Sequence, residues 1–140
     1  MLYQLSEIER LLDPARPLFV RVSAGYAADL DAGSADPATG LELPGLAARP
    51  LDPEPWWTLP AGEWIARQLC HHPHRGEARF AWLLRGTVAG RGSEGEPLIA
   101  DVEVVGRVAD SLLIEADRVW QERFDASVGV EAELVSVAHA

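Results

Sequence analysis

Cysteine and lysine are among the scarcest residues in this sequence. Cys70 is the only cysteine, and the twelve basic residues are all arginine. A single thiol cannot form a disulfide within the chain, so packing alone must hold the fold together. This use of cysteine is typical of a reducing compartment, and we therefore expect a cytoplasmic protein.

Long apolar runs and an excess of positive charge are also missing. No stretch approaches the roughly 18 apolar residues that cross a bilayer, and no basic start leads into an apolar leader segment. The 12 basic and 22 acidic residues give a formal net charge of −10. Such a field repels phosphate backbones and anionic lipid headgroups over about 8 Å in physiological salt. Neither nucleic acid nor a membrane is therefore an expected partner.

Apolar residues, in contrast, are plentiful. They make up 48% of the 140 residues and include five tryptophans. This is enough to build one hydrophobic core, and it argues against intrinsic disorder. We expect residues 1–140 to form a single domain.

The first third of the chain predicts a helix followed by a strand. Ser6, with a glutamate three residues later, is typical of a helix start, and the residues 13–14, Asp-Pro, are typical of its end. Residues 18–23 alternate with period two and predict a strand whose apolar side chains face the core. Arg21 and Ser23 then share the opposite face, which either lines a cleft or lies on the solvated back of a sheet.

The second half predicts one more helix, a long hairpin and a final helix. A helix is expected near 62–70, and two alternating strands over 80–88 and 98–108 are joined by a glycine-rich connection at 90–95. The last helix begins at Asp110, and its apolar stripe consists of Leu113, Ala116, Trp120 and Phe124. Together these elements predict an α+β fold, an antiparallel sheet of four or five strands with about three helices packed on one face.

Two segments lack this periodicity. Residues from about 25 to 60 form an irregular loop, since seven Pro or Gly residues lie between Gly33 and Pro53. Within it, residues 41–43 are a candidate for a short strand. The end of the chain, at about 126–140, alternates weakly and predicts either an edge strand or a partly ordered tail.

The glycines at 90–95 match the pattern G-x-G-x-x-G. In dinucleotide-binding folds this pattern works because a helix follows and presents its N-terminus to a pyrophosphate. Here Glu96 and Pro97 lead directly into a strand. We therefore interpret the segment as a hairpin loop.

Residues 70–74, Cys-His-His-Pro-His, place four possible metal ligands close together. Adjacent residues on a helix point about 100° apart, so one tetrahedral site cannot use them all. A helix end with solvated histidines explains the cluster, and we expect no metal site.

Three tryptophans, Trp56, Trp57 and Trp64, fall within nine residues. Their indoles could line a ligand pocket or anchor the irregular loop onto the core, since tryptophan buries a large apolar area while its N–H still needs a partner. Both interpretations remain open.

Arg21 with Ser23, and Glu94 with Glu96, form R-x-S and E-x-E units in that order. Their order resembles that of mono-ADP-ribosyltransferases, which hold NAD with an arginine on the first strand and engage the nicotinamide ribose with a glutamate of an E-x-E motif. The resemblance implies NAD as cofactor and Arg21, Glu94 and Glu96 as catalytic residues. The serine-containing middle motif is absent, because Ala47 stands where a serine is wanted.

The whole chain more closely resembles an uncharacterised family of short proteins from GC-rich bacteria. The resemblance rests on the stretches 40–46, 53–57, 64–70, 90–92 and 96–98. The resemblance implies a single-domain unit rather than a fragment, and it implies no activity.

Two functional hypotheses follow. The first is a domain that binds a small molecule or a protein partner through the irregular loop and the tryptophans, with Ser23, Trp56, Trp57 and Trp64 as ligand-binding residues and no cofactor. The second is an NAD-dependent transferase that uses Arg21 and Glu96. The sequence indicates neither the ligand nor the oligomeric state.

Overall fold

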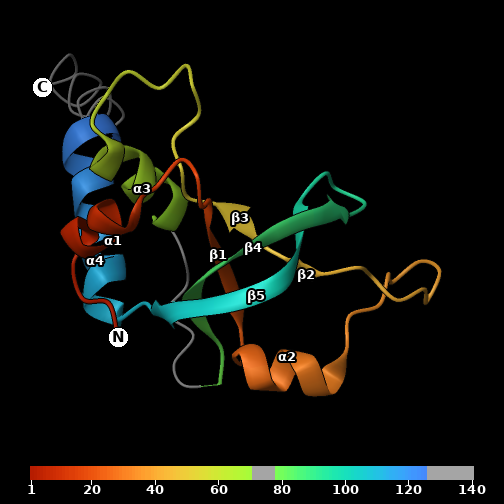
Figure 1. Ribbon diagram of the computed structural model, residues 1–140. Helices are drawn as coiled ribbons and strands as arrows, with labels where there is room; N and C mark the ends of the chain where they lie inside the picture. The colour runs from red at the N-terminus through yellow and green to blue at the C-terminus, as the bar shows by residue number, and fades with distance from the viewer. Residues whose placement is uncertain (71–77, 126–140) are drawn as a thin grey trace, which may run out of the picture.

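The computed structural model describes residues 1–70 and 78–125. The elements, in chain order, are α1 (Leu5–Leu11), β1 (Leu18–Ser23), α2 (Tyr26–Ala32), β2 (Leu46–Ala47), β3 (Arg49–Pro50), α3 (Ala61–Leu69), β4 (Phe80–Arg91), β5 (Pro97–Arg107), α4 (Asp110–Trp120) and a π-helical turn, η1 (Gln121–Asp125). A five-stranded antiparallel sheet carries α1, α3 and α4 on one face (Figure 1). The predicted α+β class is confirmed.

No helix within residues 1–70 and 78–125 is both long and apolar enough to cross a membrane.

The sheet closes on itself through one short segment. Its strand order is β2-β5-β4-β1-β3, and β4 pairs with both β5 and β1. In a flat sheet β2 and β3 would lie about 19 Å apart, four strand spacings. Only Ala48 separates them in the chain, and a step of two residues spans at most about 7 Å. The sheet must therefore curl until residues 46–50, the crossing segment, can join β5 to β1 (Figure 1).

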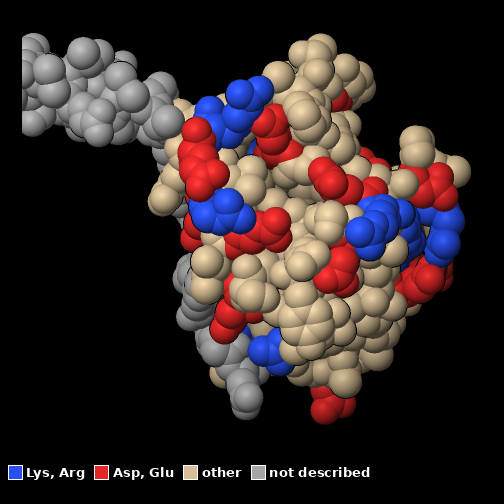
Figure 2. Space-filling model, turned by 90° about the vertical axis from the view of Figure 1, so that its left-hand side faces the viewer, with Lys and Arg blue, Asp and Glu red and all other residues tan. Residues whose placement is uncertain are grey.

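The helix-covered face of the sheet, here called the helical face, carries the larger core. Apolar side chains of β1 and β4 meet the inner sides of three helices there. The central members are all at most 3% exposed and are Ile8, Leu18, Val20, Ile65, Leu83 and Leu112. Burying each such side chain contributes roughly 1.5–3 kcal/mol. Outside this core, acidic and basic side chains mix over the helices (Figure 2).

One cation is buried on the helical face. Arg85 of β4 is 8% exposed. Its guanidinium donates to the carbonyl oxygen of Leu11, the last residue of α1, and to that of Arg16, in the loop that follows α1. The last carbonyls of a helix lack partners within it, so Arg85 ties this helix end to the sheet.

The opposite face, here called the inner face, carries a second apolar cluster. Phe19, Trp82, Leu84 and Ile99 from the three long strands pack with residues of the crossing segment. The ring of Tyr26 in α2 lies 6.0 Å from that of Trp82. The face of β1 that carries Arg21 is therefore covered rather than solvated.

Several predicted details are corrected. The first helix begins at Leu5 with Gln4 as its N-cap, and Glu7, not Glu9, accepts the hydrogen bond of the Gln4 amide (3.2 Å). The last helix ends at Trp120, and Trp120 and Phe124 are only half-buried.

The irregular loop is also more structured than predicted. It contains α2 and the crossing segment, whereas residues 41–43 contribute a single bridge, from Glu42 to Ala35. The predicted tail at 126–140 lies outside the described residues.

Candidate functional site

A cleft of about 510 Å³ opens beside the crossing segment. Residues 20–22 of β1, residues 47–50 and residues 94–97 of the hairpin turn line it. Its volume falls in the range of about 300–1,000 Å³ that is typical of ligand pockets. Most of the lining is Val, Ala and Pro, and the charged groups are Arg21, Arg49, Glu94 and Glu96.

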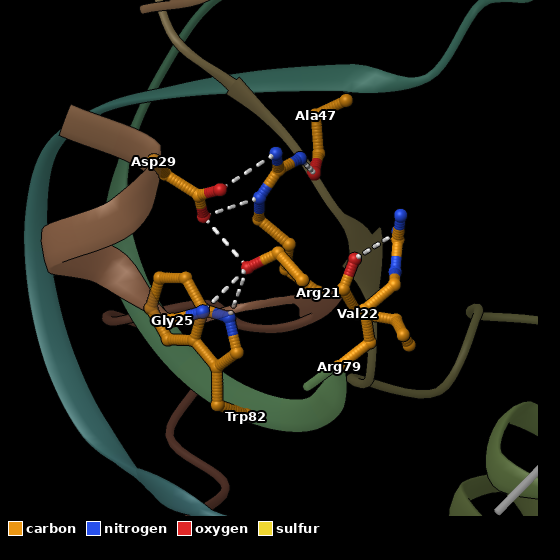
Figure 3. Close-up of polar contacts among 8 residues, drawn as sticks. Arg21, Val22, Gly25, Asp29, Ala47, Arg79 and Trp82 are labelled. Atoms are coloured by element: carbon orange, nitrogen blue, oxygen red, sulfur yellow. Dashed lines mark hydrogen bonds and ion pairs between the residues drawn. The ribbon is translucent and has the colours of Figure 1, made fainter. Parts of the chain in front are cut away.

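Arg21 is held rigidly at this cleft from two sides (Figure 3). Its Nε donates to Oδ2 of Asp29 at 2.8 Å and Nη2 reaches Oδ1 at 3.4 Å, while Nη1 donates to the carbonyl oxygen of Ala47 at 2.8 Å. The side chain is 21% exposed. A guanidinium has five N–H groups, so two of them have no hydrogen-bond partner among the described residues.

Ser23 lies behind Arg21 and does not line the cleft. Its hydroxyl donates to Oδ2 of Asp29 (2.8 Å) and accepts from Nε1 of Trp82 (2.9 Å) and from the amide of Gly25 (3.1 Å). Ser23 is therefore placed to position Asp29, and through it Arg21, rather than to contact a ligand.

Glu94 and Glu96 belong to the turn of the β4–β5 hairpin. The turn is closed by backbone hydrogen bonds from Gly92 to Glu96 and from Gly95 to Gly92, and Gly95 adopts a φ of 80° that favours glycine. No helix follows the glycine pattern, because β5 begins at Pro97. The interpretation of 90–95 as a hairpin loop is confirmed.

The two carboxylates differ in their contacts. Oε2 of Glu96 accepts the hydrogen bond of the Glu94 amide at 3.0 Å, whereas the Glu94 side chain is exposed. Arg21, Glu94 and Glu96 thus line one cleft, although they lie far apart in the chain.

The three tryptophans form a separate cluster and do not line the cleft. Trp56 and Trp57 precede α3, Trp64 lies within it, and the ring centroids are 5.2–6.1 Å apart. Trp56 is 63% exposed, whereas Trp64 is 6% exposed. The predicted ligand-binding residues therefore fall into two groups at two places on the molecule.

Only part of the cysteine–histidine cluster can be placed. Sγ of Cys70 contacts the carbonyl oxygen of Arg67 at 3.2 Å, and the three histidines at 71, 72 and 74 lie outside the described residues. Within residues 1–70 and 78–125, no three potential metal ligands converge.

Sequence reasoning did not identify Asp29 and Arg49 as site residues. Asp29 lies on α2, a short helix between Gly25 and Gly33, and those two glycines were its only local signal. Arg49 reaches the cleft because the crossing segment pairs with β1, and pairing between distant segments leaves no pattern in a single sequence.

Comparison with known proteins gives one match. The model of a family described as "Family of unknown function (DUF6098)" covers residues 1–129 of the chain. Neither a curated protein nor a solved structure matches.

Proposed function

The chain belongs to this family of unknown function, DUF6098, and we propose that it binds a small molecule in the cleft beside the crossing segment. The ligand class is a sugar phosphate or nucleotide, which carries an anionic group and several hydroxyls. The observation that carries this proposal is that Arg21 and Arg49 line the same cleft as Glu94 and Glu96.

The arginine side of the cleft suits an anionic group. The charge of Arg21 is already balanced by Asp29. Arg49 is exposed and has no carboxylate partner within residues 1–70 and 78–125, so it supplies the positive charge for an anionic group. Arg21 adds two N–H donors whose direction is fixed by its bonds to Asp29 and Ala47. A donor fixed before binding loses little conformational entropy when the ligand arrives.

The glutamate side suits hydroxyls. A carboxylate accepts hydrogen bonds from sugar hydroxyls, as an acidic residue does for ribose in dinucleotide-binding folds. The same carboxylates repel an anionic group. The charges of the cleft therefore favour one orientation of a sugar phosphate, with its phosphate toward Arg49 and its hydroxyls toward Glu94 and Glu96.

The amino-acid composition is compatible with a compact ligand and with a cytoplasmic location. The net charge of −10 disfavours extended polyanions, and the single cysteine is typical of a cytoplasmic protein. A compact ligand with one or two phosphates is compatible with both.

The binding proposal can be tested by titrating the full chain with ADP-ribose and ribose 5-phosphate, followed by NMR of the backbone amides of residues 94–96 and of the arginine Nε–H groups. We expect saturable shifts confined to the cleft. Arg49→Gln should weaken binding about tenfold or more, since hydrogen bonds to charged groups contribute about 1.5–3 kcal/mol. The control Arg10→Gln removes the same charge from the exposed end of α1. Equal affinity in the two variants, or no binding at millimolar concentration, would contradict the proposal.

A second candidate function is NAD-dependent ADP-ribosyl transfer. It is favoured by the presence of Arg21, Glu94 and Glu96 in one cleft, in the chain order of the resemblance. In that reaction the bond between nicotinamide and ribose breaks, nicotinamide leaves, and water or an acceptor bonds to the ribose. Against it stand Ala47 in place of a serine and the occupation of Arg21 by Asp29.

Nicotinamide release separates the two candidates. A transferase would release nicotinamide from NAD, and Glu96→Gln would abolish the release while leaving the melting temperature unchanged. Binding of ADP-ribose with no nicotinamide release supports the first candidate alone.

A further inference from the structure

Beyond the cleft, and independently of it, we infer that Trp56, Trp57 and Trp64 form a binding site for a guanidinium ligand, which Arg67 of the same chain occupies in this structure. We call these three rings the tryptophan platform. No residue of the platform lines the cleft, so this site and the proposed function can fail separately.

The geometry of the platform is that of a cation site. The Cζ atom of Arg67 lies 5.8, 5.9 and 5.4 Å from the ring centroids of Trp56, Trp57 and Trp64. All three distances fall within the roughly 6 Å over which an aromatic face attracts a cation. The rings meet one another edge to face, at interplanar angles of 69–78°. One guanidinium therefore contacts three indoles at once.

Among the described residues, the guanidinium of Arg67 is held by aromatic contacts. Trp64 and Arg67 are three residues apart on α3, so their side chains are neighbours on the helix surface. Across residues 1–70 and 78–125, the guanidinium has no ion pair or hydrogen bond, whereas Arg16, Arg21 and Arg123 pair with carboxylates. Arg67 is also exposed. Its side chain can therefore turn into solvent without breaking a polar contact.

The platform does not depend on Arg67 for its shape. Trp64 is 6% exposed, Nε1 of Trp57 donates to the carbonyl oxygen of Pro60 at 3.2 Å, and the Trp57 ring packs 6.0 Å from Phe124. These contacts remain when Arg67 turns away. The indole faces that it leaves are then open to another cation.

Charge and shape together favour a guanidinium as that ligand. The chain carries a net charge of −10, which attracts cations. A guanidinium is planar and weakly hydrated, and it stacks on aromatic faces more readily than an ammonium does. The group that already occupies the platform is itself a guanidinium. The ligand is therefore a small guanidinium compound or an arginine side chain of a partner peptide, and both present the same group.

The test is a titration of the full chain with methylguanidinium chloride, followed by tryptophan fluorescence. Methylurea, which has a similar planar shape and no charge, is the control for shape, and potassium chloride is the control for ionic strength. We expect saturable binding of methylguanidinium and none of methylurea. A short arginine peptide then distinguishes a peptide partner from a small molecule by its higher affinity.

Two variants test the role of Arg67 and the platform. Arg67→Ala removes the competing cation and should tighten methylguanidinium binding about 2- to 30-fold, the range that matches reported cation–π energies. Arg10→Ala, at the last turn of α1, loses the same charge and should change nothing. Trp56→Ala, at a residue that is 63% exposed, should weaken binding without lowering the melting temperature. Equal binding of methylurea, or equal affinity in Arg67→Ala and Arg10→Ala, would overturn the inference.

Discussion

The two faces of the sheet differ in the kinds of side chain that cover them. On the helical face, the buried side chains of the described residues are apolar apart from Arg85, and they come from three helices, from two strands and from the connecting residues Leu51 and Val108. On the inner face the apolar cluster around Trp82 continues into a polar network of Ser23, Asp29 and Arg21, which ends at the cleft. The helical face therefore provides most of the stability, and the inner face positions the groups that a ligand would contact.

The polar atoms of Ser23 and Asp29 all have partners, which explains how the network can be largely buried. The Ser23 hydroxyl makes three hydrogen bonds, and both Asp29 oxygens have partners. Satisfied networks of this kind contribute less to stability than an apolar core of equal volume would, but they fix the directions of their members. Removing one member leaves the others unpaired and should cost more than the network contributes.

The largest loss of stability is expected for a substitution in the core of the helical face. Leu112→Ala removes a fully buried side chain of α4 and should lower the free energy of unfolding by about 2–5 kcal/mol. The matched control is Ile114→Ala on the same helix, which is 56% exposed and should change that free energy by less than about 0.5 kcal/mol. Urea unfolding measures both. Similar losses in the two variants would show that the helical face is not the main core.

An intermediate effect is expected where the inner face is polar. Asp29→Ala leaves the guanidinium of Arg21 without its carboxylate and should cost about 2–3 kcal/mol. Asp31→Ala, exposed on the same helix, serves as the control. In a double-mutant cycle, adding Arg21→Met should recover part of the loss, because no unpaired charge then remains. Strictly additive losses would mean that the ion pair does not link β1 to α2.

The smallest effect concerns the hydroxyl at the centre of the network. Ser23→Ala removes the acceptor of the Trp82 indole N–H and a donor to Asp29, and it should cost about 1–2 kcal/mol. The indole N–H resonance of Trp82 should shift in the NMR spectrum, whereas that of Trp57, which donates to Pro60, should not. An unshifted Trp82 signal would place its hydrogen bond elsewhere.

Elements with internal periodicity could be predicted from the sequence. The strand at Leu18–Ser23 has the predicted bounds, and the hairpin and the helices α3 and α4 lie where their apolar spacing places them. The start of α1 was misassigned because Ser6 offers the same kind of capping pattern as Gln4. Gln4 and Ser6 are only two residues apart, so the packing of the helix, and not the local sequence, determines which of them is the N-cap.

Elements defined by distant partners could not be predicted. The strands β2 and β3 have two residues each, too few for any alternation, and they exist because β5 and β1 pair with them. The candidate site shows the same division. Arg21 and Glu96 were identified from their order in the chain. Asp29, the partner of Arg21, could not be identified, because it is brought to Arg21 by the turn at Gly25, and the spacing of Arg21 and Asp29 in the sequence does not predict that turn.

The crossing segment both closes the sheet and lines the cleft. If residues 46–50 detached from β5 or from β1, the sheet would open and the cleft would be lost at the same time. A ligand that binds only the closed form adds to the free energy of that opening, by about 2.7 kcal/mol when its concentration is a hundred times its dissociation constant. Amides that exchange hydrogen through this opening, such as those of Ala48 and Leu51, whose bonds reach Pro97 and Leu18, would exchange more slowly. Ligand binding in the cleft would thus be detected as an increase in the local stability of the sheet, without a change in the average structure of the sheet.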